Sequence, residues 1–284
     1  MLRVLFHKDV EAAPLLSKVS DYTKTAEMLK LPFWIFTEHS DPIGVVITGK
    51  EPVRLLAPMG TRLAIVNLVQ KNWSGDLLKE FASQTVKLAL EQEAAYMTVE
   101  LLAEEEAAID SFAEAGFTVL ADSFMMSLRL DQEFTFLHTL EFNQVRKEEM
   151  ANWIQSARKC LSGSKDVVME RILANIGDLP RNLMDMYYSL EKFYFVNRGE
   201  QEIGVLNYNP QAGMISNIGV DVTERGQGYG RQIMLFGLKQ LQTANCEQAK
   251  LRVHVENQPA IRLYESLGFK VSKRRKLLIY ETGT

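Results

Sequence analysis

The segment Ile218–Arg231 reads IGVDVTERGQGYGR and is the most informative stretch of the chain. An apolar strand, Met214–Val220, runs into three alternating glycines, Gly226, Gly228 and Gly230, and an amphipathic helix follows. Glycine lets the backbone turn tightly and approach a ligand closely. The first amides of a helix lack intrahelical acceptors and attract anions. The segment therefore predicts a pyrophosphate site at a strand-to-helix corner.

Two other phosphate-binding motifs fit this segment poorly. A P-loop requires Gly-Lys-Ser/Thr, but Gly230 is followed by Arg231. A dinucleotide fingerprint requires Gly-x-Gly-x-x-Gly. Its last position falls on Arg231 when the pattern starts at Gly226, and on Ile233 when it starts at Gly228. For this segment alone, a glycine-rich turn that merely caps the helix is the alternative.

A second motif follows the strand Lys250–Val255, where residues 256–269 read ENQPAIRLYESLGF. Together the two segments resemble the GNAT superfamily of N-acetyltransferases. The phosphate motif of that family, Arg/Gln-x-x-Gly-x-Gly/Ala, matches residues 225–230. Its later motif, Asn-x-x-Ala-x-x-Leu-Tyr-x-x-x-Gly-Phe, matches in register at Asn257, Ala260, Leu263, Tyr264, Gly268 and Phe269. The resemblance covers about Leu140–Tyr280, and the first half matches mainly in the order of its elements.

The resemblance implies a role for each site residue. The backbone groups of Ile218 and Val220 would pair with the pantetheine arm of coenzyme A, and Asn257 would hold that arm near its far end. Tyr264 would stand beside the sulfur and protonate the leaving thiolate as a general acid. Acetyl-CoA would be the co-substrate, and no metal is expected. The diphosphate would sit on the loop, whose expected coenzyme-binding residues are Arg225, Gly226, Gln227, Gly228, Tyr229, Gly230 and Arg231.

Simpler structural roles stay open for several of these residues. Asn257 is also placed to cap the helix that starts near Pro259. Tyr264 is also placed to pack on the sheet. Arg225, Arg231 and Glu224 are typical of solvated loop charges, although a nearby diphosphate would give the two arginines a function.

The sequence does not identify the general base. The strand Met214–Val220 contains no side chain that titrates near neutral pH, although Ser216 or Asn217 would be able to hold a water. His254 lies in an alternating strand, where a structural or surface role is expected. The remaining candidates, which the sequence does not rank, are Glu202 and Tyr208.

The first half of the chain repeats the order of the second. AAIDSFAEAGF at 107–117 aligns with PAIRLYESLGF at 259–269, with a constant offset of 152 residues. Each is preceded by a strand, a helix, another strand and a hairpin signal, which indicates an internal duplication. We predict two tandem α/β (α+β) domains, 1–131 and 132–284, each a mixed, mostly antiparallel sheet flanked by helices. The predicted strands are Phe33–Thr37, Gly44–Thr48, Leu63–Val69, Tyr96–Leu102, Phe193–Val196, Gly204–Tyr208, Met214–Val220 and Lys250–Val255, with helices at 75–93 and 228–244.

Three further features are predicted outside the repeat. Helices are expected at 146–161 and 167–176, and Gly177–Pro180 would end the second. The basic run Lys273–Lys276 is expected to be a solvated hairpin turn between the last two strands.

The coenzyme site of the second half has no counterpart in the first. With the offset of 152, Gly228 corresponds to Asp76 and Tyr264 to Phe112. An acid at that position repels a diphosphate, and phenylalanine has no proton to give. The first domain is therefore expected to keep the fold without the coenzyme, as scaffold or as one wall of a substrate cleft.

The composition of the chain limits the classes of binding partner that are expected. The chain has 284 residues with 46% hydrophobic and 24% charged residues, and its net charge of −4 gives no basic footprint for nucleic acid. No segment reaches membrane-spanning length. The two cysteines, Cys160 and Cys246, are far apart and lack metal-like spacing, which favours thiols in a reducing cytoplasm. We expect a cytoplasmic monomer or homodimer that binds neither nucleic acid nor membrane.

The predicted function is transfer of an acetyl group from acetyl-CoA to a primary amine of a small molecule or peptide, by direct attack. The alternative is a non-catalytic acyl-CoA-binding or sensor protein. Tyr264 argues against that alternative, because binding alone needs no proton donor.

Overall fold

The computed structural model describes residues 2–51, 56–69, 73–135, 139–163, 165–166, 168–171 and 181–283, without the side chains of 182 and 183. Its contacts divide the chain into two compact units. The first unit contains the described residues of 1–52, 57–122 and 274–284, and the second contains Leu56 and those of 123–273. No helix within these ranges combines the length and the apolar character needed to cross a membrane.

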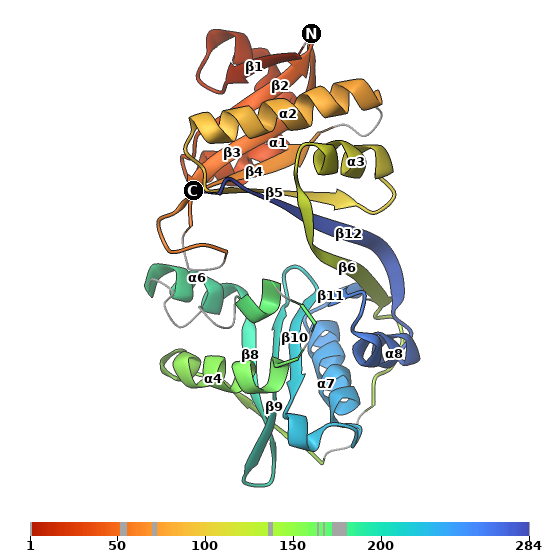
Figure 1. The fold of residues 1–284 in the computed structure, drawn as a ribbon. Helices are drawn as coiled ribbons and strands as arrows, with labels where there is room; N and C mark the ends of the chain where they lie inside the picture. Colours follow the sequence, from red (N-terminus) through yellow and green to blue (C-terminus); the bar gives the residue numbers. More distant parts are fainter. Residues whose placement is uncertain are drawn as a thin grey trace. The chain divides into compact units, whose positions relative to one another are not determined.

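The first unit is a sheet with helices on both faces (Figure 1). Its strands follow the order β1-β2-β3-β4-β5-β12, and the pairs are antiparallel except for the parallel pair β4 and β5. The strands are β1 (Leu2–Phe6), β2 (Phe33–Glu38), β3 (Asp41–Lys50), β4 (Arg62–Leu68), β5 (Tyr96–Leu102) and the last part of β12 (Lys270–Glu281). The helices are η1 (Val10–Ala12), α1 (Ala13–Met28), α2 (Gly75–Glu91) and α3 (Glu106–Glu114).

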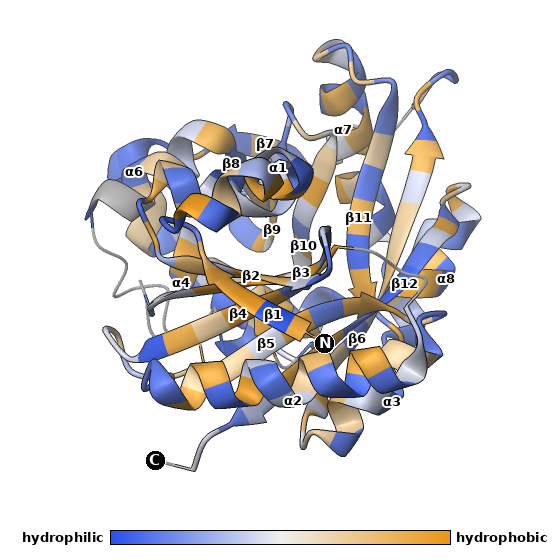
Figure 2. Ribbon diagram, turned by 90° about the horizontal axis from the view of Figure 1, so that it is seen from above, coloured by the Kyte–Doolittle hydropathy of each residue, from blue (hydrophilic) through white to orange (hydrophobic). Residues whose placement is uncertain are grey.

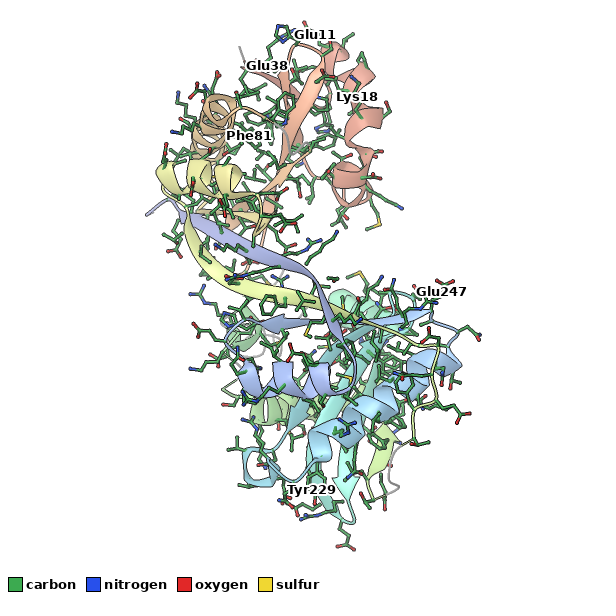
Figure 3. All side chains as sticks on the ribbon, turned by 90° about the vertical axis from the view of Figure 1, so that its right-hand side faces the viewer. Glu11, Lys18, Glu38, Phe81, Tyr229 and Glu247 are labelled. Carbon is green, nitrogen blue, oxygen red and sulfur yellow. The ribbon has the colours of Figure 1, made fainter. Side chains whose placement is uncertain are left out.

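Alternating side chains on β2 build two apolar layers in this unit. Successive side chains of a strand point to opposite faces. Phe33 and Ile35 pack with α1, whereas Phe36 packs with α2 and α3. Phe81 points from α2 toward the sheet, where its ring meets that of Phe36 at a centroid distance of 5.1 Å (Figure 3). Apolar and polar residues alternate in bands along α2 (Figure 2), and its buried residues include Leu77, Leu78 and Phe81, which belong to the core.

The second unit has the same arrangement of a sheet between helices. Its strands follow the order β6-β11-β10-β9-β8-β7, and the parallel pair here is β10 and β11. The strands are the last part of β6 (Thr118–Arg129), β7 (Glu141–Gln144), β8 (Lys192–Arg198), β9 (Gln201–Asn209), β10 (Met214–Val220) and β11 (Gln248–His254). The helices are η2 (Lys147–Glu149), α4 (Met150–Leu161), α6 (Arg181–Leu190), η4 (Val222–Glu224), α7 (Tyr229–Thr243) and α8 (Gln258–Ser266).

Two separate cores hold the helices of the second unit. Trp153 of α4 and Phe193 of β8 belong to the core that carries α4 and α6. Leu206 of β9 and Ile233 of α7 belong to the core on the other face, which also includes Ile261 of α8. The Trp153 ring nitrogen donates to the Tyr194 carbonyl at 3.1 Å, so the buried indole is satisfied.

Strands β6 and β12 contribute to both units. From Ser123 to Arg129, β6 pairs with β11, and from Arg275 to Glu281, β12 pairs with β5. The two strands occupy 118–129 and 270–281, which are equivalent positions in the repeat. Each sheet thus receives its closing strand from the other half of the sequence. The compact units therefore comprise different residues from the predicted ranges 1–131 and 132–284.

The structure confirms the predicted fold class and most predicted elements. Met214–Val220 and Tyr96–Leu102 are strands with those bounds. The structure also contains α1, α6 and β7, which the sequence did not predict. Of the helix predicted at 167–176, residues 168–171 are helical, and the rest, with the break at Gly177–Pro180, lies outside the described residues.

The prediction of a hairpin turn at Lys273–Lys276 is wrong, because this run lies inside β12. Acidic side chains of neighbouring strands neutralise it: Arg274 binds Asp122 at 2.6 Å, and Arg275 binds Glu100 at 2.6 Å. Because of these ion pairs, the run of basic residues is part of the strand and does not end it.

Candidate active site

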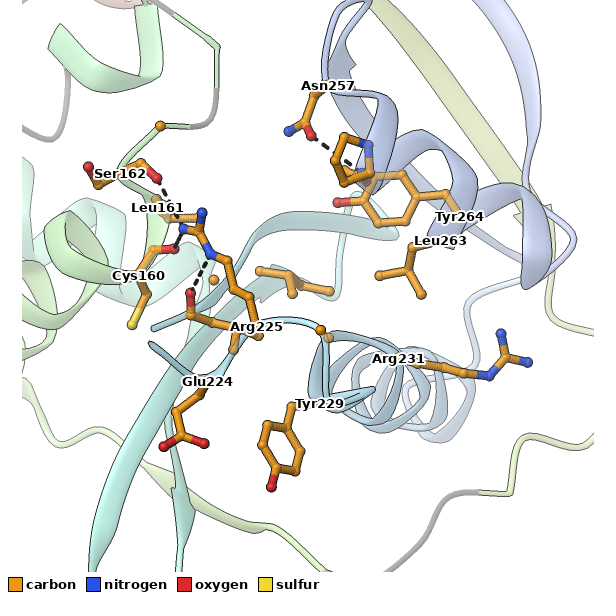
Figure 4. Close-up of a pocket in the computed structure, with 18 of the residues that line it drawn as sticks. Cys160, Leu161, Ser162, Glu224, Arg225, Tyr229, Arg231, Asn257, Leu263 and Tyr264 are labelled. Atoms are coloured by element: carbon orange, nitrogen blue, oxygen red, sulfur yellow. Dashed lines mark hydrogen bonds between the residues drawn. The ribbon is translucent and has the colours of Figure 1, made fainter. Parts of the chain in front are cut away.

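The predicted site residues gather around one pocket of the second unit, with a volume of about 540 Å³ (Figure 4). Its walls are the end of β10, the loop that follows, the start of α7, the first turns of α8 and the end of α4. Gln227 belongs to the same loop, where its side chain donates to Glu224 at 3.2 Å. The predicted residues that line the pocket are Ile218, Val220, Arg225, Gly226, Gly228, Tyr229, Gly230, Arg231, Asn257 and Tyr264.

The pocket opens where the parallel strands β10 and β11 separate. They pair at Met214 and Lys250, near the start of β10. The Asp221 amide donates to the Ile203 carbonyl of β9 at 2.8 Å. Because the hydrogen-bonding groups of a strand alternate between its two edges, those of Val220 and Ile218 face the other edge, toward the opening. An extended amide chain such as pantetheine fits an exposed strand edge of this kind.

Two glycines give the phosphate loop, residues 224–230, its shape. Gly226 and Gly228 have φ angles of 81° and 83°, in the left-handed region. A Cβ atom at either position would meet nothing within 4 Å, so the backbone angle and not space requires glycine. Gly228 is the N-cap of α7 and supplies no capping side chain, so the first amides of α7 are available to an anion.

Gly230 has a different role from the other two glycines. It lies in the first turn of α7, and its φ is not positive. A Cβ atom there would lie 3.5 Å from Leu263 and 3.9 Å from Val220, both of which line the pocket. The absence of a side chain at Gly230 therefore keeps the pocket open.

The Arg225 side chain ties the phosphate loop to α4. Its guanidinium donates to the carbonyls of Val220 at 3.0 Å, Cys160 at 2.9 Å and Ser162 at 3.0 Å (Figure 4). The guanidinium thus positions the loop through carbonyl groups. The Val220 carbonyl is engaged by Arg225, so the pantetheine pairing expected for Val220 falls to its N–H group.

An ion pair between a buried carboxylate and an exposed arginine corrects the expectation that Glu224 is solvated. Glu224 is 8% exposed and pairs with Arg198 of β8 at 3.2 Å. Arg198 also donates to the Tyr229 hydroxyl at 2.7 Å. Arg198 lies in a hairpin 26 residues before Glu224 along the chain, so no local pattern revealed the pair.

Two further side-chain pairs, one on each side of the phosphate loop, connect the site to α4 and α8. Lys159 of α4 pairs with Asp221, and this hydrogen bond lowers the pKa of Asp221 to about 2. Asp221 also accepts from the Thr223 amide at 3.0 Å, which starts the turn after β10. Arg231 binds Ser266 of α8 at 2.9 Å and extends away from the loop (Figure 4).

Tyr264 lies on α8 and faces the pocket (Figure 4). Burial raises the pKa of its hydroxyl to about 12, so it is protonated at neutral pH and able to donate a proton. Its ring also packs against Phe269, with a centroid distance of 5.9 Å. The packing role and the pocket-lining role therefore coexist.

Asn257 caps α8 and lines the pocket as well. Its side-chain oxygen accepts from the Ala260 amide at 3.3 Å, so the structural role foreseen for it is present. The coenzyme contact stays a prediction.

The candidates for the general base have different surroundings. Glu202 is exposed on β9, and Tyr208 is buried against Tyr194. The His254 ring nitrogen Nδ1 is 3.3 Å from the Glu256 amide. Ser216 donates at 2.7 Å to Glu191, a carboxylate that the sequence did not indicate. Glu191 directly precedes β8 and belongs to no motif, so local spacing gave no signal for it.

The equivalent corner of the first unit is closed. Strands β4 and β5 pair over four positions, from Leu63 with Tyr96 to Val66 with Val99. Ser74 caps α2 by accepting from the Leu77 amide at 3.4 Å. Phe112, which corresponds to Tyr264, is fully buried, with its ring 5.0 Å from that of Phe117 and 6.0 Å from that of Phe81. In the first unit, the replacement of polar site residues therefore accompanies a longer pairing of the two parallel strands β4 and β5, which closes the corner.

Part of the second unit is similar in sequence to known acetyltransferases. The family model of the acetyltransferase (GNAT) family matches residues 169–269. A mycothiol acetyltransferase of Thermobispora bispora is 35% identical over 101 residues, which are 32% of this chain and 34% of that protein. N-alpha-acetyltransferase 30 of Saccharomyces cerevisiae is 34% identical over 62 residues, which are 22% of this chain and 35% of that protein. These matches thus span about a third of the length of the relatives.

Solved structures show the same fold over the whole chain. A tandem GNAT protein from the clavulanic acid biosynthesis pathway aligns with a TM-score of 0.64 and 14% identity, covering 100% of this chain and 99% of the other. A GCN5-related N-acetyltransferase of Sphaerobacter thermophilus aligns with a TM-score of 0.59 and 15% identity, covering 98% and 95%. The chain as a whole has the fold of the tandem GNAT structures, and residues 169–269 of its second unit match the family model of the acetyltransferase (GNAT) family.

Proposed function

We propose that the protein transfers an acetyl group from acetyl-CoA to a primary amine of a small molecule or peptide, by direct attack of the amine. The observation that carries the proposal is the pocket between the separated strands β10 and β11. The N-terminus of α7, which follows the glycine-rich loop, lines one part of this pocket, and the protonated Tyr264 lines another part. The first suits a diphosphate, and the second suits a leaving thiolate.

Different residues of the second unit would have different roles in this reaction. The amides at the start of α7 would hold the diphosphate. The free edge of β10 would align the pantetheine arm beside Ile218 and Val220. As the amine nitrogen bonds to the carbonyl carbon, the C–S bond breaks and Tyr264 gives its proton to the sulfur. General acid catalysis of this type contributes roughly 10²–10⁴ in rate.

Thiol release in the presence of a panel of amines tests the proposal. We expect turnover by the wild-type chain and a loss of about 10²-fold or more in kcat for Tyr264→Phe, because the hydroxyl alone is removed. Affinity for coenzyme A, measured by titration calorimetry, is expected to stay unchanged, because the ring is kept.

Tyr194→Phe is the matched control. Tyr194 is another buried tyrosine of the same unit, outside the pocket, and its loss of a hydroxyl is expected to leave turnover unchanged. If Tyr264→Phe is as active as wild type, the general-acid role is wrong. If acetyl-CoA binds but no amine is acetylated, a non-catalytic acyl-CoA-binding or sensor role replaces the enzyme.

A further inference from the structure

A partly buried carboxylate lies beside the point where β10 leaves β11. Ser216 of β10 donates to Glu191 Oε1 at 2.7 Å, and Asn207 of β9 donates to Glu191 Oε2. Tyr187 of α6 faces the same group, because its hydroxyl lies 3.5 Å from the Asn207 amide nitrogen. Asn217 donates to the other end of the Asn207 side chain at 2.8 Å. We name these five residues the Glu191 cluster.

A bulge in β10 brings Ser216 to this carboxylate. The register between β10 and β9 shifts between Ile215 and Asn217, so Ser216 is the extra residue. A bulge re-aims the side chain of its extra residue, and bulges are frequent next to active sites. The bulge follows Met214, the residue at which β10 still pairs with β11.

The position of the bulge along β10 relates the cluster to the proposed reaction. The phosphate loop follows the C-terminal end of β10, so a carrier bound there would run back along the strand, with its acyl end toward the bulge. Ile218 lines the pocket, and Ser216 precedes it by two residues, or about 6–7 Å of strand. None of the five cluster residues lines the pocket, and the cluster lies beyond its Ile218 end, in the direction in which the acyl end of the carrier would point.

The electrostatic surroundings of Glu191 suit a proton acceptor. Burial raises its pKa above the usual value, whereas the hydrogen bonds from Ser216 and Asn207 lower it. Burial also raises the pKa of Tyr187, so that hydroxyl stays protonated. Glu191 keeps partial exposure, unlike the fully buried Asn207.

We propose that Glu191 is the general base that accepts the proton of the attacking amine, an inference that rests on the acetyl transfer proposed above. The nitrogen–carbon bond forms and the carbon–sulfur bond breaks. The amine proton passes to the Glu191 carboxylate, while the Tyr264 proton passes to the sulfur. Exchange with water then restores both groups. Ser216 and Asn207 are positioning residues in this scheme.

The pH dependence of kcat/KM with one accepted amine tests the role of Glu191. Glu191→Gln is nearly isosteric: its amide oxygen can accept from Asn207, and its NH2 group can donate to the Ser216 hydroxyl, which then accepts, so a purely structural role would be preserved. We expect it to lower kcat/KM by about 10²-fold or more at neutral pH, as for loss of a general base. We also expect the acid limb that belongs to Glu191 to disappear, with the affinity for coenzyme A unchanged.

Ser216→Ala supplies a second readout, independent of the first. It removes a hydrogen bond that lowers the Glu191 pKa, so the acid limb of kcat/KM should move to higher pH. The ionisation of the free amine is the same for every variant and cannot produce this shift. Glu141→Gln, which changes an exposed glutamate on β7, is the control and should leave the profile in place.

Activity of Glu191→Gln within threefold of wild type, or an unmoved acid limb in Ser216→Ala, would overturn the role of Glu191. If Glu191→Gln fails to fold, which its thermal unfolding reveals, the Ser216→Ala profile decides alone. Failure of the proposed function gives a different result, because wild type itself would then bind acetyl-CoA without acetylating any amine.

Discussion

Replacement of Gly228 by alanine is expected to weaken coenzyme A binding through the backbone alone. Gly228 has a φ of 83°, and an added Cβ atom would meet nothing within 4 Å. A left-handed conformation costs a residue with a side chain roughly 1–2 kcal/mol. If the loop relaxes to avoid this cost, the amides at the start of α7 turn away from the diphosphate.

The loss of affinity follows from the hydrogen bonds that these amides would make. A hydrogen bond to a charged group contributes about 1.5–3 kcal/mol. Loss of one such bond therefore raises Kd by roughly 10–100-fold, because 1.4 kcal/mol corresponds to a factor of ten. Titration calorimetry of the full chain with coenzyme A measures this change, and thermal unfolding measures the strain.

Gly60→Ala is the matched control for Gly228→Ala. Gly60 has a φ of 85° and equally open surroundings, but it lies in the first unit. Both variants should lose about the same stability, and only Gly228→Ala should lose affinity. An unchanged Kd for Gly228→Ala, with stability lowered as in the control, would refute the assignment of the diphosphate to this corner.

Two further predictions concern ionisable groups near the pocket. Burial raises the pKa of Cys160 from 9.0 to about 12, so its thiolate fraction at pH 8 is lower by about 10³. Alkylation by iodoacetamide, followed by mass spectrometry, should accordingly leave Cys160 of the native chain unmodified under conditions that label an unfolded sample; rapid native labelling would contradict this. Lys159→Met should lower thermal stability at neutral pH, because it leaves Asp221 without its cation. The folded pKa of Asp221 is depressed to about 2, so its stabilising effect is present above the unfolded pKa of about 4 and is lost as the pH falls through 2. The difference in melting temperature between wild type and variant should therefore shrink from pH 7 to pH 3, and a difference independent of pH would count against the pair.

The phosphate corner could be read from sequence because its requirements are local. The left-handed angles of Gly226 and Gly228, the helix that begins at Tyr229 and the strand that ends at Val220 lie within consecutive residues. The repeat could be read for the same reason, since residues 107–117 and 259–269 form the equivalent helices α3 and α8. The roles of Tyr264 and Asn257 toward a coenzyme stay predictions, although both side chains line the pocket.

Only the tertiary structure decided which strand closes each sheet. Strands β6 and β12 hold equivalent places in the repeat, so each satisfies the local pattern of either sheet, and the choice depends on pairing partners far away in sequence. The Glu191 cluster could not be predicted for the same reason, because its members come from α6, the residue before β8, β9 and β10 and meet through a bulge. The contact of Arg225 with the end of α4 could not be predicted either, because the two segments are about 65 residues apart in the chain. Local backbone geometry and helix capping are determined by neighbouring residues, so they can be predicted from the sequence. Strand exchange and the pairing of charges between distant segments depend on contacts that form only when those segments fold together.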